Sequence, residues 1–150
     1  MNKIIVIDGN DQNLCLEVGR KIAESYHIPC YWKRIREMVS RECDVPEDEL
    51  YTNRSAAVRD VFSIAIFMMM KKGSCVFVGN GAAHVLSHTE DVLSVMLISD
   101  QSTDESYDKY FENLTGSGMK KYLDFGFVIR IKDQTADELA LAVRKMADLP

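Results

Sequence analysis

Residues 4–24 read IIVIDGNDQNLCLEVGRKIAE, and this stretch decides the fold. A nearly continuous apolar run from Lys3 to Asp8 ends in the turn-forming residues DGND, which is typical of a strand buried on both faces of a sheet. From about Asn13 to His27, apolar residues recur at helical spacing, with charged residues on the opposite face. A buried strand followed directly by an amphipathic helix predicts the first unit of an α/β domain.

The rest of the chain repeats this alternation of strand and helix signals. Apolar runs without polar alternation predict buried strands, and apolar residues at helical period predict helices. The elements expected after the first helix are, in chain order, an extended piece at 28–31, a helix at 32–41, a break or new helix at 43–49, a helix at 54–72 with Asn53 as N-cap, a strand at 75–78, a short helix through Leu86, a strand at 92–98, a helix at 107–114, a loop at 115–118, a strand at 125–131 and a final helix opened by a capping box at 135–138. They predict a three-layer α/β/α domain with a mostly parallel central sheet, and the length of 150 residues suits a single domain over residues 1–150.

The composition narrows the classes of partner. The formal charge of −5 disfavours a nucleic-acid partner, because binding to a phosphate backbone needs a basic face. The longest apolar run, residues 64–70, is too short to cross a bilayer, and the first residues lack the apolar core of a signal peptide. We therefore expect no nucleic acid, no membrane and a cytoplasmic location.

The four cysteines show no CxxC spacing, and a reducing cytosol would keep them as thiols. We expect Cys30 and Cys75 to be core residues. Cys15 lies near the predicted start of the first helix, where the pKa of a thiol can fall. A reactive thiol and a buried filler are both open for Cys15, and the filler is favoured because free cysteines are usually buried.

The segment at 61–70 reads VFSIAIFMMM and is apolar nearly all round. A helix of this composition must be buried on most sides, either in the core or against a second subunit. The segment therefore predicts a possible homodimer through residues 61–70.

Polar residues follow several of the predicted strands. Ligands of open parallel sheets bind beyond the carboxyl ends of the strands. The candidate ligand-binding residues are therefore Asp8, Asn10, Asn13, Asn80 and Asp100. Asparagine and aspartate are also frequent in ordinary turns, so the same cluster has a purely local explanation.

No catalytic or metal site is expected. His84 and His88 are four residues apart but lack a third ligand, whereas a metal needs three or four. No GxSxG elbow or comparable nucleophile motif follows a strand.

The turn after the first strand does not match a phosphate-binding loop. Such a loop has the form GxxxxGK[ST], in which glycines let backbone N–H groups wrap the phosphates and the lysine reaches the terminal ones. A pattern started at Gly9 places Leu14, Cys15 and Leu16 at the second glycine, the lysine and the hydroxyl. An ordinary strand-to-helix turn is the favoured interpretation.

Two segments together carry a resemblance to the cytidylate kinase-like family. Members of that family open with an apolar strand, a Gly-Ser-Gly-Gly-Arg loop, Glu-Ile-Gly, a helix and Gly-Ile-Pro-Tyr-Tyr. Residues 17–23 and 28–31, EVGRKIA and IPCY, keep this frame. Residues 75–86, CVFVGNGAAHVL, resemble the family's strand and Val-Gly-Arg-x-Ala-Asp-Tyr-Ile-Leu turn, with its next strand opening at 91–95. The resemblance implies a P-loop kinase fold related to nucleoside monophosphate kinases.

The chain departs from that family where phosphate would be held. Residues 12–15 replace the glycine loop, Leu16 its arginine, and Asn80 the arginine of the second turn. The region at 101–122, which the resemblance implies to be a lid, contains lysines but no arginine. The lysines are Lys109, Lys120 and Lys121, of which Lys120 and Lys121 are the lid candidates.

These departures favour a degenerate, non-catalytic member of the family that acts as a binding or interaction protein and needs no cofactor. The alternative is an active nucleotide or nucleoside kinase with an altered loop, which would recruit Asp8, Lys120 and Lys121 and use ATP and Mg²⁺. A third hypothesis is a binder of a neutral or weakly anionic metabolite at the polar strand ends. The sequence does not name the small-molecule ligand.

Overall fold

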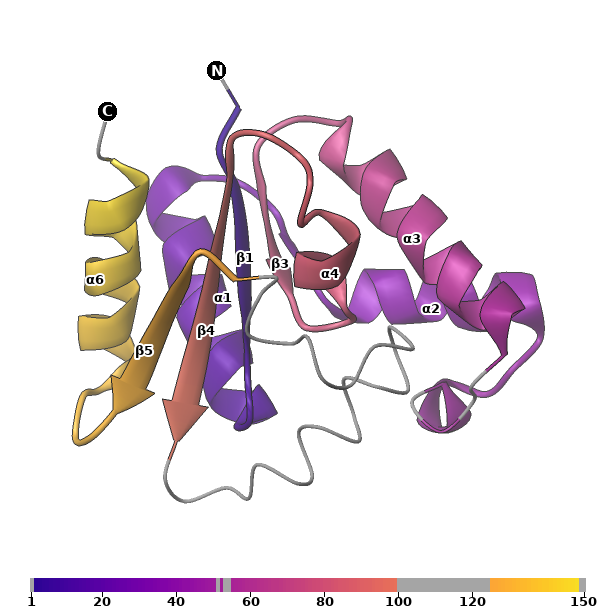
Figure 1. Ribbon diagram of the computed structural model, residues 1–150, viewed down its shortest axis with the longest axis horizontal. Helices are drawn as coiled ribbons and strands as arrows, with labels where there is room; N and C mark the ends of the chain where they lie inside the picture. Colours follow the sequence, from indigo (N-terminus) through magenta and orange to yellow (C-terminus); the bar gives the residue numbers. More distant parts are fainter. Residues whose placement is uncertain (1, 51, 53–54, 100–124, 149–150) are drawn as a thin grey trace.

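The computed structural model describes residues 2–50, 52, 55–99 and 125–148. Five parallel strands form one sheet in the order β2-β3-β1-β4-β5 (Figure 1). The strands are β1 (Ile4–Gly9), β2 (Cys30–Tyr31), β3 (Cys75–Val78), β4 (Val92–Ser99) and β5 (Phe127–Ile131). The helices are α1 (Gln12–Tyr26), α2 (Lys33–Cys43), the 3-10 turn η1 (Glu47–Glu49), α3 (Ala56–Met70), α4 (Ala82–Val85) and α6 (Ala136–Ala147). The predicted three-layer α/β/α architecture with a parallel sheet is confirmed.

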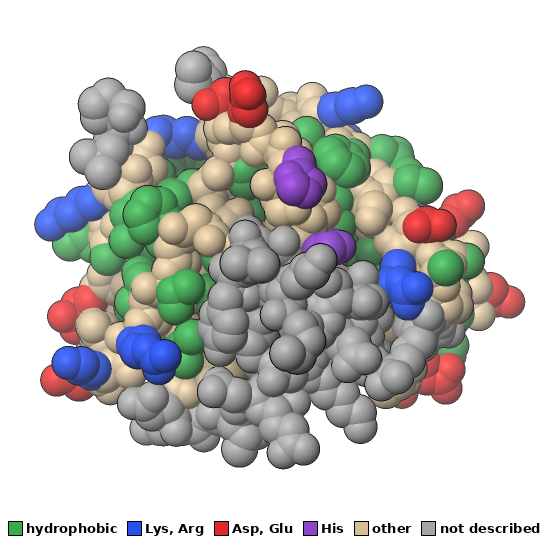
Figure 2. All heavy atoms as spheres, in the orientation of Figure 1, with side chains coloured by type: hydrophobic (Ala, Val, Ile, Leu, Met, Phe, Trp, Pro, Cys, Tyr) green, Lys and Arg blue, Asp and Glu red, His purple; other side chains and the backbone are tan. Residues whose placement is uncertain are grey.

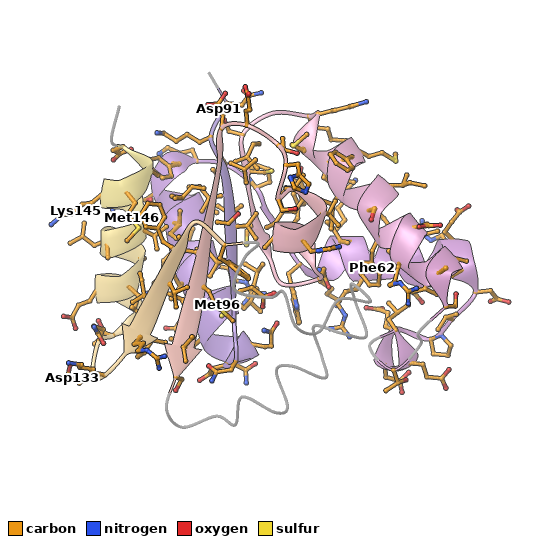
Figure 3. All side chains as sticks on the ribbon, in the orientation of Figure 1. Phe62, Asp91, Met96, Asp133, Lys145 and Met146 are labelled. Atoms are coloured by element: carbon orange, nitrogen blue, oxygen red, sulfur yellow. The ribbon has the colours of Figure 1, made fainter. Side chains whose placement is uncertain are left out.

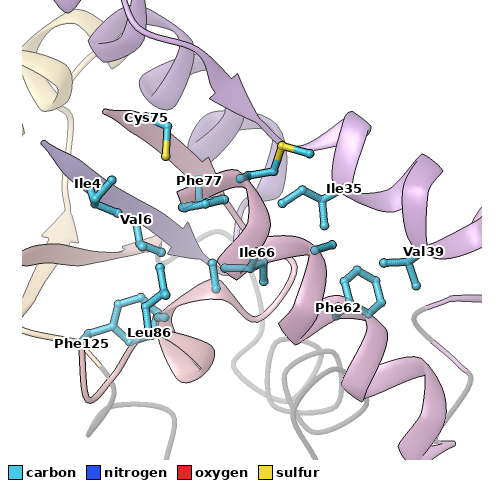
Figure 4. Close-up of a cluster of buried hydrophobic side chains, with 14 of the residues drawn as sticks. Ile4, Val6, Ile35, Val39, Phe62, Ile66, Cys75, Phe77, Leu86 and Phe125 are labelled. Atoms are coloured by element: carbon cyan, nitrogen blue, oxygen red, sulfur yellow. The ribbon is translucent and has the colours of Figure 1, made fainter. Parts of the chain in front are cut away.

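The central strand β1 is buried along its whole length because helices cover both faces of the sheet. Ile5 and Ile7 point toward α1 and α6, and pack with residues such as Val18 and Leu139. On the other face, Ile4 and Val6 belong to the core formed with α2, α3 and α4, in which Figure 4 shows Phe62, Ile66 and Phe77 gathered. Burial on both faces explains why the β1 sequence is apolar without alternation.

α1 packs unusually close to β3 at Gly19. An added Cβ at Gly19 would lie 2.4 Å from Cγ2 of Val78, so no larger residue fits at this crossing without displacement. α1 ends at His27, whose left-handed φ of 56° lets its N–H reach Ala23 O and Glu24 O. The chain then passes through Pro29 into β2, and Val76 N donates to Pro29 O at 2.9 Å. The extended piece expected at 28–31 therefore contributes a fifth strand at the edge of the sheet.

The ends of the helices differ from expectation at α3. This helix begins at Ala56, and Ser55 is its N-cap because its hydroxyl accepts from Val58 N at 3.2 Å, so the expected cap at Asn53 is wrong. The capping box of α6 is confirmed: Thr135 Oγ1 accepts from Glu138 N and the Glu138 carboxylate accepts from Thr135 N. The helix expected at 107–114 and the loop at 115–118 lie outside the described residues. Within the described ranges, no helix is both long and apolar enough to cross a membrane.

Candidate functional site

The turn from β1 to α1 is very short. Only Asn10 and Asp11 separate the end of β1 at Gly9 from the start of α1 at Gln12. Asp11 is the N-cap, and its Oδ1 accepts from Leu14 N at 3.1 Å. A helix N-terminus attracts anions through its unpaired N–H groups and its dipole. In this chain, the carboxylate of Asp11 lies at the start of α1, where an anion would bind.

Asp8 is a buried acid directly before this turn. Its side chain has no exposed surface, and its Oδ1 accepts from Gly9 N at 2.8 Å and from Gln12 Nε2 at 2.9 Å. Among the described residues, no group donates to its other oxygen, Oδ2. Burial raises the pKa of Asp8 to about 6, and the hydrogen bonds from Gln12 and Gly9 oppose this rise.

Asn10 ties the turn to the neighbouring strand β4. Its Nδ2 donates to Ser99 O at 2.8 Å, and its Oδ1 accepts from Ser99 N at 2.7 Å. Both ends of the side-chain amide are thus used to join the carboxyl ends of β1 and β4. The strands also approach closely here, because an added Cβ at Gly9 would lie 2.0 Å from Leu97 O.

Asn80 has a similar role after β3. It is 2% exposed, and its Nδ2 donates to Trp32 O at 3.0 Å, which fastens the β3 turn to the start of α2. Asn80 has a φ of 59°, and the flanking Gly79 and Gly81 have φ values of 64° and 73°. Asparagine tolerates this left-handed region better than most residues, so the turn itself explains its presence.

The other candidate residues are not brought to this cluster by the described structure. Asn13 lies exposed on α1, beside Glu17 and Lys21 in a shallow cavity of about 370 Å³. Asp100, Lys120 and Lys121 lie outside the described residues. Of the five ligand-binding candidates, the structure thus places Asp8, Asn10 and Asn80 at the carboxyl ends of adjacent strands. In the described part of the chain, no group of three or more histidine, cysteine or acidic side chains could hold a metal ion.

Cys15 is a core residue. It is fully buried beneath the β1–α1 turn, and burial, followed by the charges of Asp8 and Asp11, raises its pKa well above the usual range. A buried thiol with a raised pKa forms little thiolate, which supports the favoured interpretation of Cys15 as a core residue. Cys75 is buried as expected, and Cys30 is half-buried against the same core as α1. Burial raises the pKa of Cys30 to about 11 and that of Cys75 to about 12.

Sequence reasoning alone missed two residues that shape this site, Asp11 and Gln12. Asp11 carries a usable signal, because an aspartate directly before an amphipathic run is a typical N-cap. Gln12 carries no such signal. Its Nε2 bridges Asp8 Oδ1 and Gly9 O, the latter at 2.6 Å, and this bridge depends on the shortness of the turn.

A cavity of about 600 Å³ lies at the other end of the strands, beside the amino ends of β1 and β4. Its lining includes Asp91 and Met146, which Figure 3 shows near the upper ends of β4 and α6, away from the arrowheads of the strands. Lys3 and Asp148 line it as well, with Lys3 Nζ 3.3 Å from Asp148 Oδ1. Ligands of parallel sheets bind at the carboxyl edge, so this cavity does not coincide with the expected site.

Comparison with solved structures identifies the fold. An uncharacterised protein from Eubacterium ventriosum superposes with a TM-score of 0.73 and 19% identity, covering 99% of both chains. Shikimate kinase from Bacteroides thetaiotaomicron gives a TM-score of 0.68 at 14% identity, covering 99% of this chain and 100% of its own. Shikimate kinase from Acinetobacter baumannii, solved in complex with shikimate, gives 0.65 at 12% identity, covering 97% of this chain and 92% of its own.

These similarities show that the chain has the three-layer α/β fold of the shikimate kinases, which is a P-loop kinase-like fold. No protein-family model matches the sequence, and no curated protein sequence matches it either.

Proposed function

We propose that this chain is a degenerate, cytidylate kinase-like member of the P-loop kinase fold that transfers no phosphate and acts as a binding or interaction protein. The observation that carries the proposal is the two-residue turn between β1 and α1. A working phosphate loop needs several residues between its first glycine and its helix, because their backbone N–H groups must wrap the phosphates. Here the corresponding residues from Gln12 onward are already in α1, and their N–H groups are directed along the helix axis.

The charges around the turn support the same proposal. The carboxylate of Asp11 already accepts the hydrogen bond from Leu14 N that a phosphate oxygen would take. Asp8 lies buried just before the turn, and above its pKa of about 6 it adds a second negative charge. A phosphate placed at this helix start would face like charges where a kinase supplies a lysine.

The size of the expected catalytic loss favours a non-catalytic role. Phosphoryl transfer depends almost entirely on positioning and on charge stabilisation. Removal of a single preorganised donor from such a site costs roughly 10²–10³ in rate. A site without the wrapped loop, its lysine and the arginine of the second turn is therefore expected to retain almost no activity.

The state of the amide side chains favours an interaction protein over a metabolite binder. Asn10 and Asn80 use their amides to join backbone segments of the domain itself. Their contacts link β1 to β4 and β3 to α2, which stabilises the carboxyl edge of the sheet. The carboxyl ends of these strands are thus held together by contacts within the domain, so we expect partners to be bound elsewhere on the surface.

A phosphotransfer assay tests the proposal. Purified protein is incubated with Mg²⁺ and ATP labelled at the γ-phosphate, with CMP, nucleosides and shikimate as separate acceptors. Kinases turn over at about 1–100 s⁻¹, and we expect transfer at least about 10³-fold slower. Transfer at an ordinary kinase rate would contradict the proposal.

A paired variant identifies the alternative function if transfer is seen. Under the alternative, Asp8, Lys120 and Lys121 are recruited to catalysis with ATP and Mg²⁺. The double variant Lys120→Ala/Lys121→Ala would then abolish transfer, whereas Lys132→Ala, an exposed lysine beyond β5, would leave it unchanged. Equal activity of both variants would point to a contaminating kinase.

A further inference from the structure

α3 presents an apolar stripe to solvent. Ile64, Phe67 and Met68 are 57%, 38% and 51% exposed, although they are among the large hydrophobic residues of the chain. The opposite side of the same helix is buried, with Phe62, Ile66 and Met69 in the core. The domain therefore buries only part of the apolar surface of α3.

Opposite charges flank this stripe along the helix. Asp60 lies one turn before Ile64, and Lys71 lies one turn after Phe67, and both side chains are exposed. Eleven residues make about three helical turns, with an excess of only about 20°, so Asp60 and Lys71 lie on the same side of the helix as the stripe. Neither forms an ion pair with another residue of the described ranges.

The spacing of these residues is self-complementary in one arrangement. When two copies of α3 pair antiparallel about a twofold axis between Ala65 and Ile66, Ile64 of one copy lies opposite Phe67 of the other. The same axis also sets Asp60 opposite Lys71, so each apolar centre is bordered by two attractive charge pairs. A parallel pairing would instead place Asp60 beside Asp60 and Lys71 beside Lys71, which is repulsive.

We propose that the exposed face of α3 is the interface of a symmetric homodimer, with α3 packed antiparallel against α3 of a second copy of this chain. Twofold interfaces are isologous, so a patch must complement itself, and this stripe does so in apolar character and in charge. Figure 2 shows hydrophobic side chains over the upper part of α3, with a basic side chain at its upper end and acidic side chains further down. The charge pairs at the rim set the register, and the buried centre supplies most of the association free energy.

The first experiment is sedimentation velocity on the full chain without ligand. Concentrations from about 1 µM to about 1 mM cover the dissociation constants of weak to moderate complexes. We expect a reversible monomer–dimer equilibrium, and Phe67→Ser is expected to shift it to monomer. A wild-type chain that stays monomeric throughout would overturn the proposal, as would a higher oligomer.

A charge swap tests the antiparallel register. Asp60→Lys and Lys71→Asp each create two like-charge pairs, so each is expected to raise the dissociation constant by about tenfold at low salt. The double variant Asp60→Lys/Lys71→Asp restores two attractive pairs and is expected to return to within about threefold of wild type. Recovery of the dissociation constant in the double variant would support the antiparallel register, because two substitutions that only destabilise the fold would not restore each other's effect.

The matched control is Lys72→Asp. Lys72 is exposed like Lys71 and carries the same change of charge, but it follows the C-cap of α3, and one residue of helical spacing would turn it by about 100° from the line through Asp60 and Lys71. We expect it to leave the dissociation constant within about twofold. Equal weakening by Lys71→Asp and Lys72→Asp, or failure of the double variant to recover, would overturn the antiparallel α3 interface. Circular dichroism melts of each variant confirm that the exposed substitutions leave the domain folded.

Discussion

At the scale of single residues, Asp8 is the least usual group of the structure. It is an acid without exposed surface, its Oδ1 accepts two hydrogen bonds, and among described residues its Oδ2 accepts none. Burial of a charge without a partner is costly, so the protonated form is favoured and the pKa rises to about 6 from 3.8. Asp8 therefore destabilises the folded chain at neutral pH.

This cost makes the stability of the fold depend on pH. Between the ordinary pKa of 3.8 and the folded value of about 6, the folded state binds more protons at Asp8 than the unfolded state does. The contribution of protonated Asp8 is thus fully present below pH 3.8 and is lost as the pH rises through about 6. We expect Asp8→Asn to remove this pH dependence and to raise the free energy of unfolding at pH 7 by on the order of 2–3 kcal/mol.

Urea unfolding between pH 4 and pH 8 measures this effect. Asparagine keeps an oxygen that can accept from Gly9 N and Gln12 Nε2, so the local contacts of the turn are retained. Asp133→Asn is the control, because it makes the same change at an exposed carboxyl group. An Asp8→Asn variant that is less stable than wild type at pH 7 would show that the charged carboxylate is needed for folding.

The sequence predicts where these residues lie better than what they contact. Asp8, Asn10 and Asn80 follow apolar strands, and their position at the carboxyl ends can be derived from that alone. The partners of the two asparagines cannot, since Ser99 is 89 residues from Asn10 and Trp32 is 48 residues from Asn80. Only the packing of the elements brings these backbone groups within reach of the amides.

At the scale of elements, α1 depends on Gly19 for its distance from the sheet. Glycine in a helix interior is usually less stable than alanine by about 1 kcal/mol, so Gly19→Ala would stabilise an isolated helix. In this structure the new Cβ would lie 2.4 Å from a methyl group of Val78, which is itself buried and stiff. We expect Gly19→Ala to lower the free energy of unfolding by about 1–3 kcal/mol, because overpacking outweighs helix propensity.

Chemical denaturation of this variant checks the expectation. Glu17→Ala is the control within the same helix, since Glu17 is exposed and its replacement is expected to change stability by less than about 0.5 kcal/mol. A stabilised Gly19→Ala chain would mean that α1 can move away from β3 at little cost.

Elements with a clear apolar pattern could be predicted from the sequence, and these include the four-residue strand β3, whereas the pairing of β2 could not be predicted. α1 and α6 each have one apolar face and both are found where expected, although only the capping box of α6 was predicted. The two-residue strand β2 is too short to show a period, and it is a strand only because β3 lies beside it. The N-cap of α3 is Ser55 and not the predicted Asn53, because several neighbouring residues are of types that can cap a helix.

At the scale of the whole molecule, the fold is shared with the solved shikimate kinases, and two residues separate β1 from α1. β1 is the central strand of the five, and the solved shikimate kinases superpose over nearly the whole chain. Packing alone can maintain such a scaffold, because the apolar faces of β1 and α1 require it regardless of ligand. Under the proposed function, the composition of the turn is free to change because it does not have to hold phosphate.

Under the proposed function, the start of α1 does not hold a phosphate group, and the stabilisation of the fold by nucleotides measures this directly. Thermal unfolding is followed with Mg²⁺–ATP, CMP and shikimate, and with adenosine as a matched ligand that lacks phosphates. We predict that Mg²⁺–ATP and CMP raise the unfolding temperature no more than the ligands without phosphate do. A stabilisation by Mg²⁺–ATP approaching about 2.7 kcal/mol, which is expected for a ligand at 100 times its dissociation constant, with none by adenosine, would contradict the account.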